Sequence, residues 1–157
     1  MEKEVVESKE IKESKELKEI LVKHGVALAY LFGSHAKGTA RTSSDVDIAV
    51  LLPYDTPRSK FFDARLALTN ELMDLLHKNE IDVVVLNEAT PLLSHEILSA
   101  GKILYEDVAT RPTLEFAVSV AKRYADTKKF RQMSLDSVRR TVQQIKSRQS
   151  LALGGRR

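Results

Sequence analysis

The sequence predicts an α/β (α+β) domain in which a small mixed sheet of about four strands is flanked by helices, followed by a C-terminal helical extension. Three observations support this prediction: short apolar runs of strand length, segments of helical periodicity between them, and a change of composition near the end. The four strands are expected at residues 26–32, 45–53, 81–86 and 101–106. Pro53 ends the second run, because proline cannot continue the hydrogen bonds of a central strand.

Helical segments are predicted before, between and after these strands. A charge-rich helix is expected at 2–24, with Leu17, Ile20 and Leu21 as its packing face and Gly25 at its C-terminal end. Apolar residues recur at helical spacing between Lys60 and Lys78, and Pro91 can open a short helix through Leu98.

The last segment, 112–150, is predicted to be helical, with an interruption at 127–133 that divides it into two helices, the second capped by Ser134. We expect residues 1–132 to form the main domain, including the N-terminal helix, and residues 133–157 a basic extension. The extension carries apolar residues at heptad spacing, Leu135, Val138, Val142 and Ile145.

Composition restricts the chemistry. The chain has 157 residues, 43% of them hydrophobic, and no cysteine, so a metal must be held by oxygen or imidazole ligands. The N-terminus is charged, without an apolar leader, and the apolar runs are too short to span a bilayer, so we expect a cytoplasmic protein away from the membrane. Residues 111–157 hold twelve Lys or Arg against three acids, which indicates an acidic partner for the tail.

Two aspartates stand at the start of the second predicted strand. Side chains two positions apart in a strand point to the same face, so Asp45 and Asp47 should present two carboxylates side by side. Their repulsion is relieved by a cation, and oxygen ligands select magnesium or manganese. Asp82 enters the third predicted strand at the equivalent position and becomes a third ligand if the strands are neighbours.

Gly33 and Ser34 close the first strand and open a short helical turn. A glycine allows the backbone to approach a phosphate, while exposed amides and the serine hydroxyl donate to its oxygens. Lys37 and Arg41 would supply positive charge to a triphosphate. Acids for a metal together with amides and basic side chains for phosphates indicate nucleotidyl transfer from a metal-bound nucleoside triphosphate.

Gly33 and Ser34, ten residues, and then Asp45, Val46 and Asp47 resemble the G-S-x10-D-x-D signature of the polymerase-beta-like nucleotidyltransferases. The stretch 20–130 is similar to the minimal nucleotidyltransferases, which act as antitoxins beside HEPN ribonuclease toxins. The resemblance implies the polymerase-beta-like fold, two Mg²⁺ ions, and AMP transfer from ATP to a tyrosine of a HEPN-domain toxin. It assigns metal binding and catalysis to Asp45, Asp47 and Asp82, and implies a hetero-oligomer with the toxin.

Two other functions stay open from the sequence: an antitoxin that acts by binding alone, and a nucleotidyltransferase that modifies a small molecule or an RNA end. His35 and Lys37 occupy positions where the resembled branch often has arginine. The four histidines have no metal-ligand spacing, and we expect ordinary surface or core roles for them. Nucleic acid is the less favoured partner of the tail, because no aromatic residue follows Phe130 for base stacking.

Overall fold

The computed structural model describes residue 11 and residues 14–41 and 44–154. Its elements are α2 (Lys15–Lys23), β1 (Leu28–Phe32), α3 (Gly33–Lys37), β2 (Val46–Leu51), η1 (Arg58–Lys60), α4 (Phe61–Leu76), β3 (Ile81–Val85), α5 (Pro91–Ala100), β4 (Lys102–Glu106), α6 (Thr113–Asp126) and α7 (Lys128–Gly154). The chain divides into two compact units, Met1–Ala121 and Lys122–Arg157.

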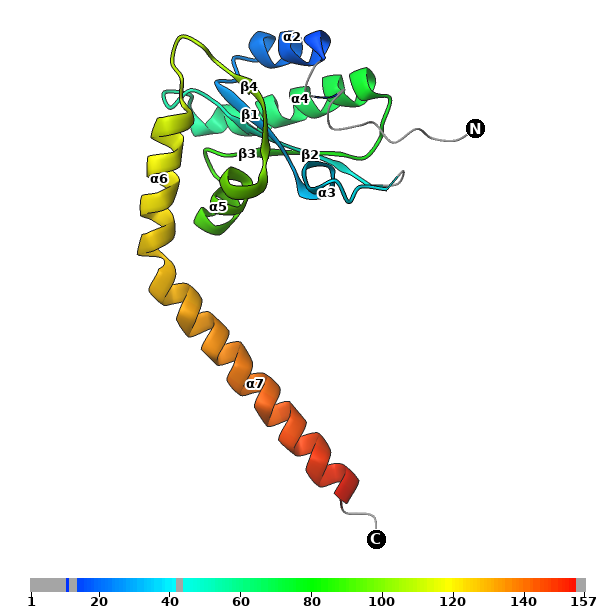
Figure 1. The fold of residues 1–157 in the computed structure, drawn as a ribbon, viewed down its shortest axis with the longest axis vertical. Helices are drawn as coiled ribbons and strands as arrows, with labels where there is room; N and C mark the ends of the chain where they lie inside the picture. Colours follow the sequence, from blue (N-terminus) through cyan, green and yellow to red (C-terminus); the bar gives the residue numbers. More distant parts are fainter. Residues whose placement is uncertain (1–10, 12–13, 42–43, 155–157) are drawn as a thin grey trace. The chain divides into compact units, whose positions relative to one another are not determined.

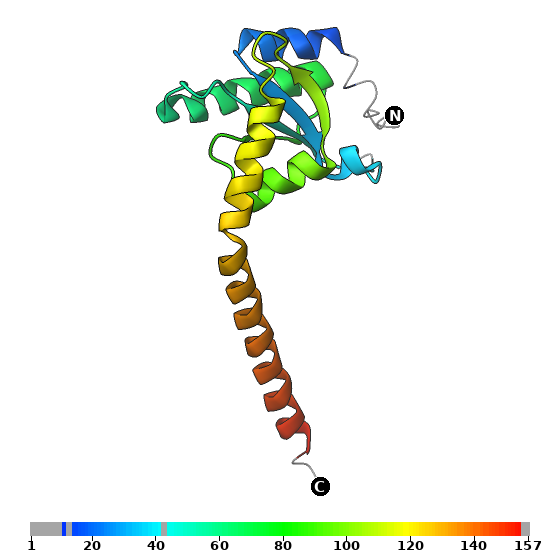
Figure 2. The ribbon, with the colours of Figure 1, turned by 60° about the vertical axis from the view of Figure 1, so that its left-hand side comes forward.

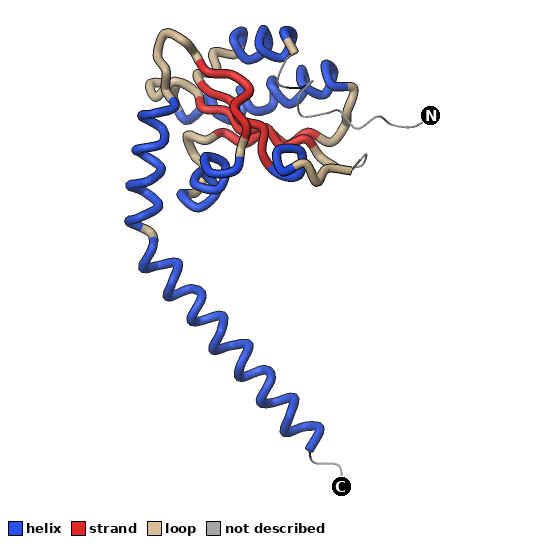
Figure 3. The backbone as a smooth tube through the Cα atoms, viewed as in Figure 1, coloured by secondary structure: helices blue, strands red, loops and turns tan. Residues whose placement is uncertain are grey.

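The first unit is built on a four-stranded mixed sheet in the order β3-β2-β1-β4 (Figure 3). β1 lies at the centre and pairs antiparallel with β2 and β4, while β2 and β3 pair in parallel through the crossover helix α4. The predicted α/β class and the four strands are therefore confirmed.

Helices cover both faces of this sheet (Figure 1). Alternate strand residues such as Leu31 and Ile48 pack with α2 and α4, whereas Tyr30 and Leu51 pack with α5 and the first part of α6. Figure 2 shows the sheet between these layers from a second direction. The strands read as continuous apolar runs because both of their faces are buried.

The described part of the predicted N-terminal helix contains α2, which begins at Lys15. The side chain of Ser14 caps α2 by accepting a hydrogen bond from the amide of Leu17 at 3.1 Å. Residues 1–10, 12 and 13 of the predicted helix lie outside the described residues, so its expected start near residue 2 stays a prediction. At the other end, Gly25 follows the C-cap His24 and donates to the carbonyl of Val22 at 2.9 Å.

The C-terminal segment consists of two helices, as predicted, and they separate at Thr127, the first residue of the predicted interruption. Ser134 lies inside α7 and does not begin a helix, because the α-helical pattern runs unbroken from Lys128 to Gly154. The expected boundary between 132 and 133 thus falls within α7, and its functional meaning stays a prediction. Among the described residues, the structure has no helix that is both long enough and apolar enough to cross a membrane.

Candidate nucleotidyl-transfer site

The candidate site is built around one rung of the sheet. In this rung Phe32 of β1 lies opposite Asp47 of β2, and Asp47 lies opposite Asp82 of β3. Asp47 alternates with Val46 and Ile48, which face α2 and α4, so its side chain emerges on the face covered by α5. Asp82 follows Ile81 in the same alternation, and the two carboxylates therefore share one face of neighbouring strands, as predicted.

Asp45 lies one residue before β2 and is exposed, so it belongs to the approach to the strand and not to the strand itself. It is nevertheless part of the same electrostatic group. Burial raises the pKa of Asp47, and the negative charges of Asp82 and Asp45 raise it further, in that order. The sequence predicted a cluster of mutually repelling acids, and a raised pKa of Asp47 is the effect expected from such repulsion.

Gly33 makes the tight approach to Asp47 possible. Its φ of +66° lies in the left-handed region, and a Cβ atom placed on it would stand 2.0 Å from Oδ2 of Asp47. No other residue type fits this position without moving the carboxylate. Gly33 is the first residue of α3, so the backbone that turns from β1 into α3 passes directly over Asp47.

A cleft of about 580 Å³ opens beside this turn. One wall contains Gly33, Lys37 and Asp47, and the other comes from α5. Ser34, Arg41, Asp45 and Asp82 are not among its lining residues. The prediction for Lys37 thus gains a location in the cleft, whereas the phosphate roles expected of Ser34 and Arg41 stay predictions.

Sequence reasoning missed the α5 wall, to which His95, Glu96 and Ser99 contribute. The helix itself was predicted from Pro91, which occupies its first turn, while Thr90 caps it by accepting from the amide of Leu93. Nothing in the local pattern indicates that α5 faces Asp47, because this proximity depends on the strand order.

His35 is almost completely buried on α3, and its Nε2 lies 3.3 Å from the carbonyl oxygen of Ser44. Positive charge on this ring would lower the pKa of Asp47, opposing the effect of the neighbouring acids. A buried histidine with a backbone partner agrees with the core role that the sequence allowed. Through His35, α3 contacts the segment that leads into Asp45 and Asp47.

The donor set suits a divalent cation in its chemistry. The negative charges of Asp82 and Asp45 raise the pKa of Asp47, and the missing Cβ of Gly33 leaves room for the Asp47 carboxylate. Hard oxygen donors of this kind are those that magnesium prefers. Within the described residues, however, no three acidic or histidine side chains are already arranged as a metal-binding group. The carboxylates therefore suit magnesium chemically, but in this conformation they do not surround one common position.

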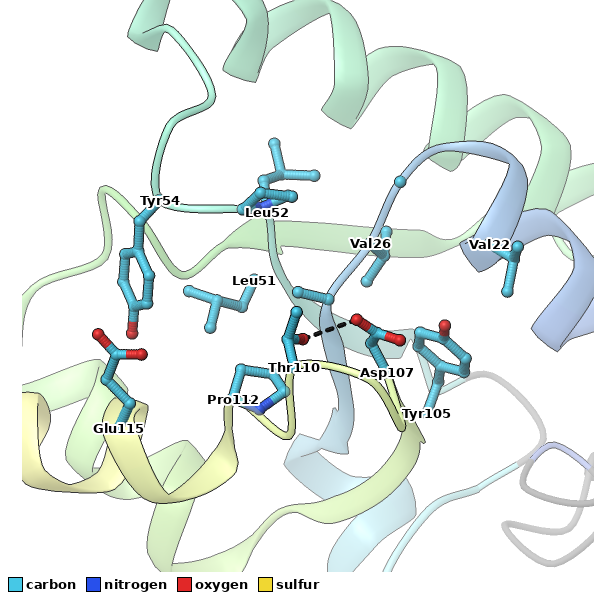
Figure 4. A pocket seen from close by; sticks show the side chains of 13 residues that line it. Val22, Val26, Leu51, Leu52, Tyr54, Tyr105, Asp107, Thr110, Pro112 and Glu115 are labelled. Atoms are coloured by element: carbon cyan, nitrogen blue, oxygen red, sulfur yellow. Dashed lines mark hydrogen bonds between the residues drawn. The ribbon is translucent and has the colours of Figure 1, made fainter.

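A second cavity, of about 360 Å³, lies at the opposite ends of β1 and β2 (Figure 4). Leu51 and Leu52 form part of its wall, and Tyr54 points toward Glu115 across it. Four residue steps along β2, or roughly 13 Å, separate Asp47 from Leu51. This cavity is therefore distinct from the cleft that contains Gly33 and Asp47.

Comparison with known proteins agrees with this geometry. Residues 15–109 match the family model described as polymerase beta, nucleotidyltransferase. This chain belongs to that nucleotidyltransferase family. It is also 36% identical, over 112 residues, to the protein adenylyltransferase MntA of Shewanella oneidensis, a match that covers 71% of this chain and 75% of the relative.

Solved structures of toxin–antitoxin complexes contain chains that resemble this chain along most of its length. A chain from a toxin–antitoxin crystal structure with AMP-PNP superposes with a TM-score of 0.66 at 30% identity, covering 80% of this chain and 98% of that chain. Another comes from the complex of the tri-AMPylated Shewanella oneidensis HEPN toxin with its MNT antitoxin, with a TM-score of 0.59, 28% identity and coverage of 76% and 90%. The predicted family and its fold are confirmed.

Proposed function

We propose that this protein is an antitoxin nucleotidyltransferase that transfers AMP from ATP to a tyrosine hydroxyl of a partner HEPN ribonuclease toxin and thereby silences the toxin. One observation carries the proposal: Gly33 is seated on Asp47, which is paired with Asp82, at the mouth of a cleft in a chain of this family. The adenylyltransferase and AMPylated-toxin relatives support the choice of ATP and of a protein acceptor.

The cleft would bind the triphosphate along the turn at Gly33. The amides at the start of α3 and the ammonium group of Lys37 would donate to phosphate oxygens, and the α5 wall would exclude water from one side. Magnesium held by Asp45, Asp47 and Asp82 would supply charge neutralisation on the phosphates and activation of the acceptor oxygen.

The reaction forms one bond and breaks one. The phenolic oxygen of the acceptor attacks the α-phosphorus, the bond from that phosphorus to the β-bridging oxygen breaks, and pyrophosphate leaves. The phenolic proton must be accepted as the new ester forms, and we assign this role to Asp82, which is more exposed than Asp47 and lies beside it. Asp47, partly buried and adjacent to Gly33, would help hold the magnesium that neutralises the phosphates.

The test is transfer of label from α-labelled ATP to the co-purified HEPN-domain toxin, with the labelled residue located by mass spectrometry. Label on a tyrosine is the expected result. Asp45→Asn combined with Asp47→Asn should abolish transfer, because asparagine preserves shape and removes the charge that would hold the metal. Transfer that survives this double change would place the activity elsewhere.

Two controls separate the remaining functions. Neutralisation of the toxin by the double variant as complete as by the wild type would favour an antitoxin that acts by binding alone. Label on RNA or on a small molecule, with none on the toxin, would favour the other enzymatic function. Ligand at about a hundred times its Kd stabilises by roughly 2.7 kcal/mol, so ATP with magnesium should raise the Tm by about 5 to 10 °C, and ATP with EDTA should not.

A further inference from the structure

Helix α7 carries a narrow apolar seam, which we define as Leu135, Val138, Val142 and Ile145. These residues follow one another at spacings of three, four and three, so they lie on one side of the helix over about 15 Å. Their exposed fractions are 57%, 60%, 43% and 50%, whereas Leu17 and Leu21 on the packing face of α2 are fully buried. The α7 seam thus has the pattern of a packing face but is solvent-exposed.

Basic side chains flank one edge of the seam. Arg139 follows Val138 and Lys146 follows Ile145, the positions that pair with a neighbouring helix when heptads associate. Between Lys128 and Lys146 the chain has six basic residues and one acid, Asp136. The pair between Arg139 and Asp136 spans 3.7 Å with both side chains largely exposed, so it neutralises Arg139 only weakly.

These charges do not favour pairing of α7 with a second copy of itself. In an antiparallel pair Arg139 would face Lys146 of the other copy, and in a parallel pair both would face the uncharged Ser134 and Thr141. In neither arrangement would the basic edge add an electrostatic attraction to the contact between two heptads of seam. A partner helix with acidic residues beside its own apolar seam would satisfy both the seam and its basic edge.

Nucleic acid explains less of this surface. Phosphates would use the basic side chains but leave the seam in water, and no aromatic residue follows Phe130 to stack on a base. The family match ends at residue 109, before α7 begins. The similar chain from the structure with AMP-PNP is matched over 98% of its own length, but this match covers only 80% of the present chain. The nucleotidyltransferase match therefore assigns no role to α7.

We propose that the α7 seam is a docking surface for a helix of a partner protein whose own apolar seam is bordered by acidic residues. This surface belongs to the second unit, whereas the residues of the nucleotidyl-transfer site belong to the first, and its role does not depend on catalysis. Its apolar residues supply the contact, and Arg139 and Lys146 select the charge of the partner and speed the encounter.

The probe is a synthetic helix of about three heptads with leucine at the core positions and glutamate beside them, titrated against the full chain by fluorescence anisotropy. The wild type should bind it, and Val138→Gln with Val142→Gln should weaken binding at least about tenfold. Arg139→Glu with Lys146→Glu should do the same and should gain affinity for a lysine-bordered version of the probe. The matched control is Lys129→Glu with Arg140→Glu, an equal change of net charge on another face of α7, which should retain most of the binding.

Three results would overturn the proposal. The first is no binding of the acidic probe by the wild type, or equal loss in both charge-reversal variants. The second is binding of a nucleic-acid duplex by the wild type. If the two charge-reversal variants bind the duplex equally weakly and the seam variant binds it as well as the wild type, α7 is a nucleic-acid surface. The third is sedimentation of the wild type as a dimer, together with sedimentation of the Val138→Gln with Val142→Gln variant as a monomer. Circular dichroism checks that each variant is folded, which the exposure of the substituted side chains favours.

Discussion

The contact between Gly33 and Asp47 gives the sharpest test of the site, through the substitution Gly33→Ala. The added Cβ would lie 2.0 Å from Oδ2 and 2.9 Å from Cγ of Asp47, whereas ordinary contact begins at 3.4 Å. One partner must therefore move by about 1.4 Å. A displacement of about 1 Å in a catalytic geometry can reduce the rate roughly a hundredfold, so we expect a loss of AMP transfer of at least that size.

Gly38→Ala is the matched control for backbone strain. Gly38 has a φ of +70°, close to the +66° of Gly33, but a Cβ on it would meet nothing within 4 Å. An L-residue in this conformation costs roughly 1–2 kcal/mol, which for a chain of this length lowers the Tm by about 2 to 8 °C. Gly33→Ala adds the displaced carboxylate, at roughly 0.5–1.5 kcal/mol for an off-rotamer side chain.

Both variants are assayed by thermal unfolding and by transfer of labelled AMP to the toxin. The expected outcome is a moderate loss of stability in both and a large loss of activity in Gly33→Ala alone. If the two variants retain the same activity, the position of Asp47 under the Gly33 turn is unimportant to catalysis and our reading of the site fails.

Three further predictions concern charge. Asp47→Asn should raise the Tm of the metal-free protein at pH 7.5, because it removes a partly buried charge that Asp82 and Asp45 repel, and should abolish stabilisation by ATP with magnesium; a lower Tm in calorimetry would contradict this. Lys37→Ala should weaken ATP binding more than Arg41→Ala, since only the first lines the cleft, and equal Kd values in a nucleotide titration would refute the difference. Glu71→Gln should lower the Tm at neutral pH, because hydrogen bonds from Lys23 and His24 hold the Glu71 pKa below its usual value. This stabilisation is present above the pKa of Glu71 in the unfolded chain and is lost as the pH falls through its pKa in the folded protein. The Tm difference between variant and wild type should therefore close in acid, and a constant difference across this pH range would contradict the prediction.

Local patterns in the sequence predicted most of the elements but not their neighbours. The strands could be predicted because runs such as 81–86 are short, apolar and β-branched, and the Gly33 turn because its glycine interrupts such a run. Contacts of the helices across the sheet could not be predicted, which is why the α5 wall was missed. The interruption predicted at 127–133 is present at Thr127, but the new helix begins at Lys128 and not at Ser134, because a residue with the chemistry of a cap can also lie inside a continuous α-helix.

The site and the core depend on the same strand register. Asp47 reaches the face of α5 only because Val46 and Ile48, its neighbours in β2, are fully buried against α2 and α4. A slip of one residue would turn Asp47 toward that apolar layer and expose both neighbours, so every buried residue of β2 opposes the slip. Packing on both faces of the sheet thus holds Asp47 near Asp82 and Asp45, although the negative charges of these two acids repel it. A bound cation would then meet the carboxylates of Asp47 and Asp82 already placed side by side on neighbouring strands.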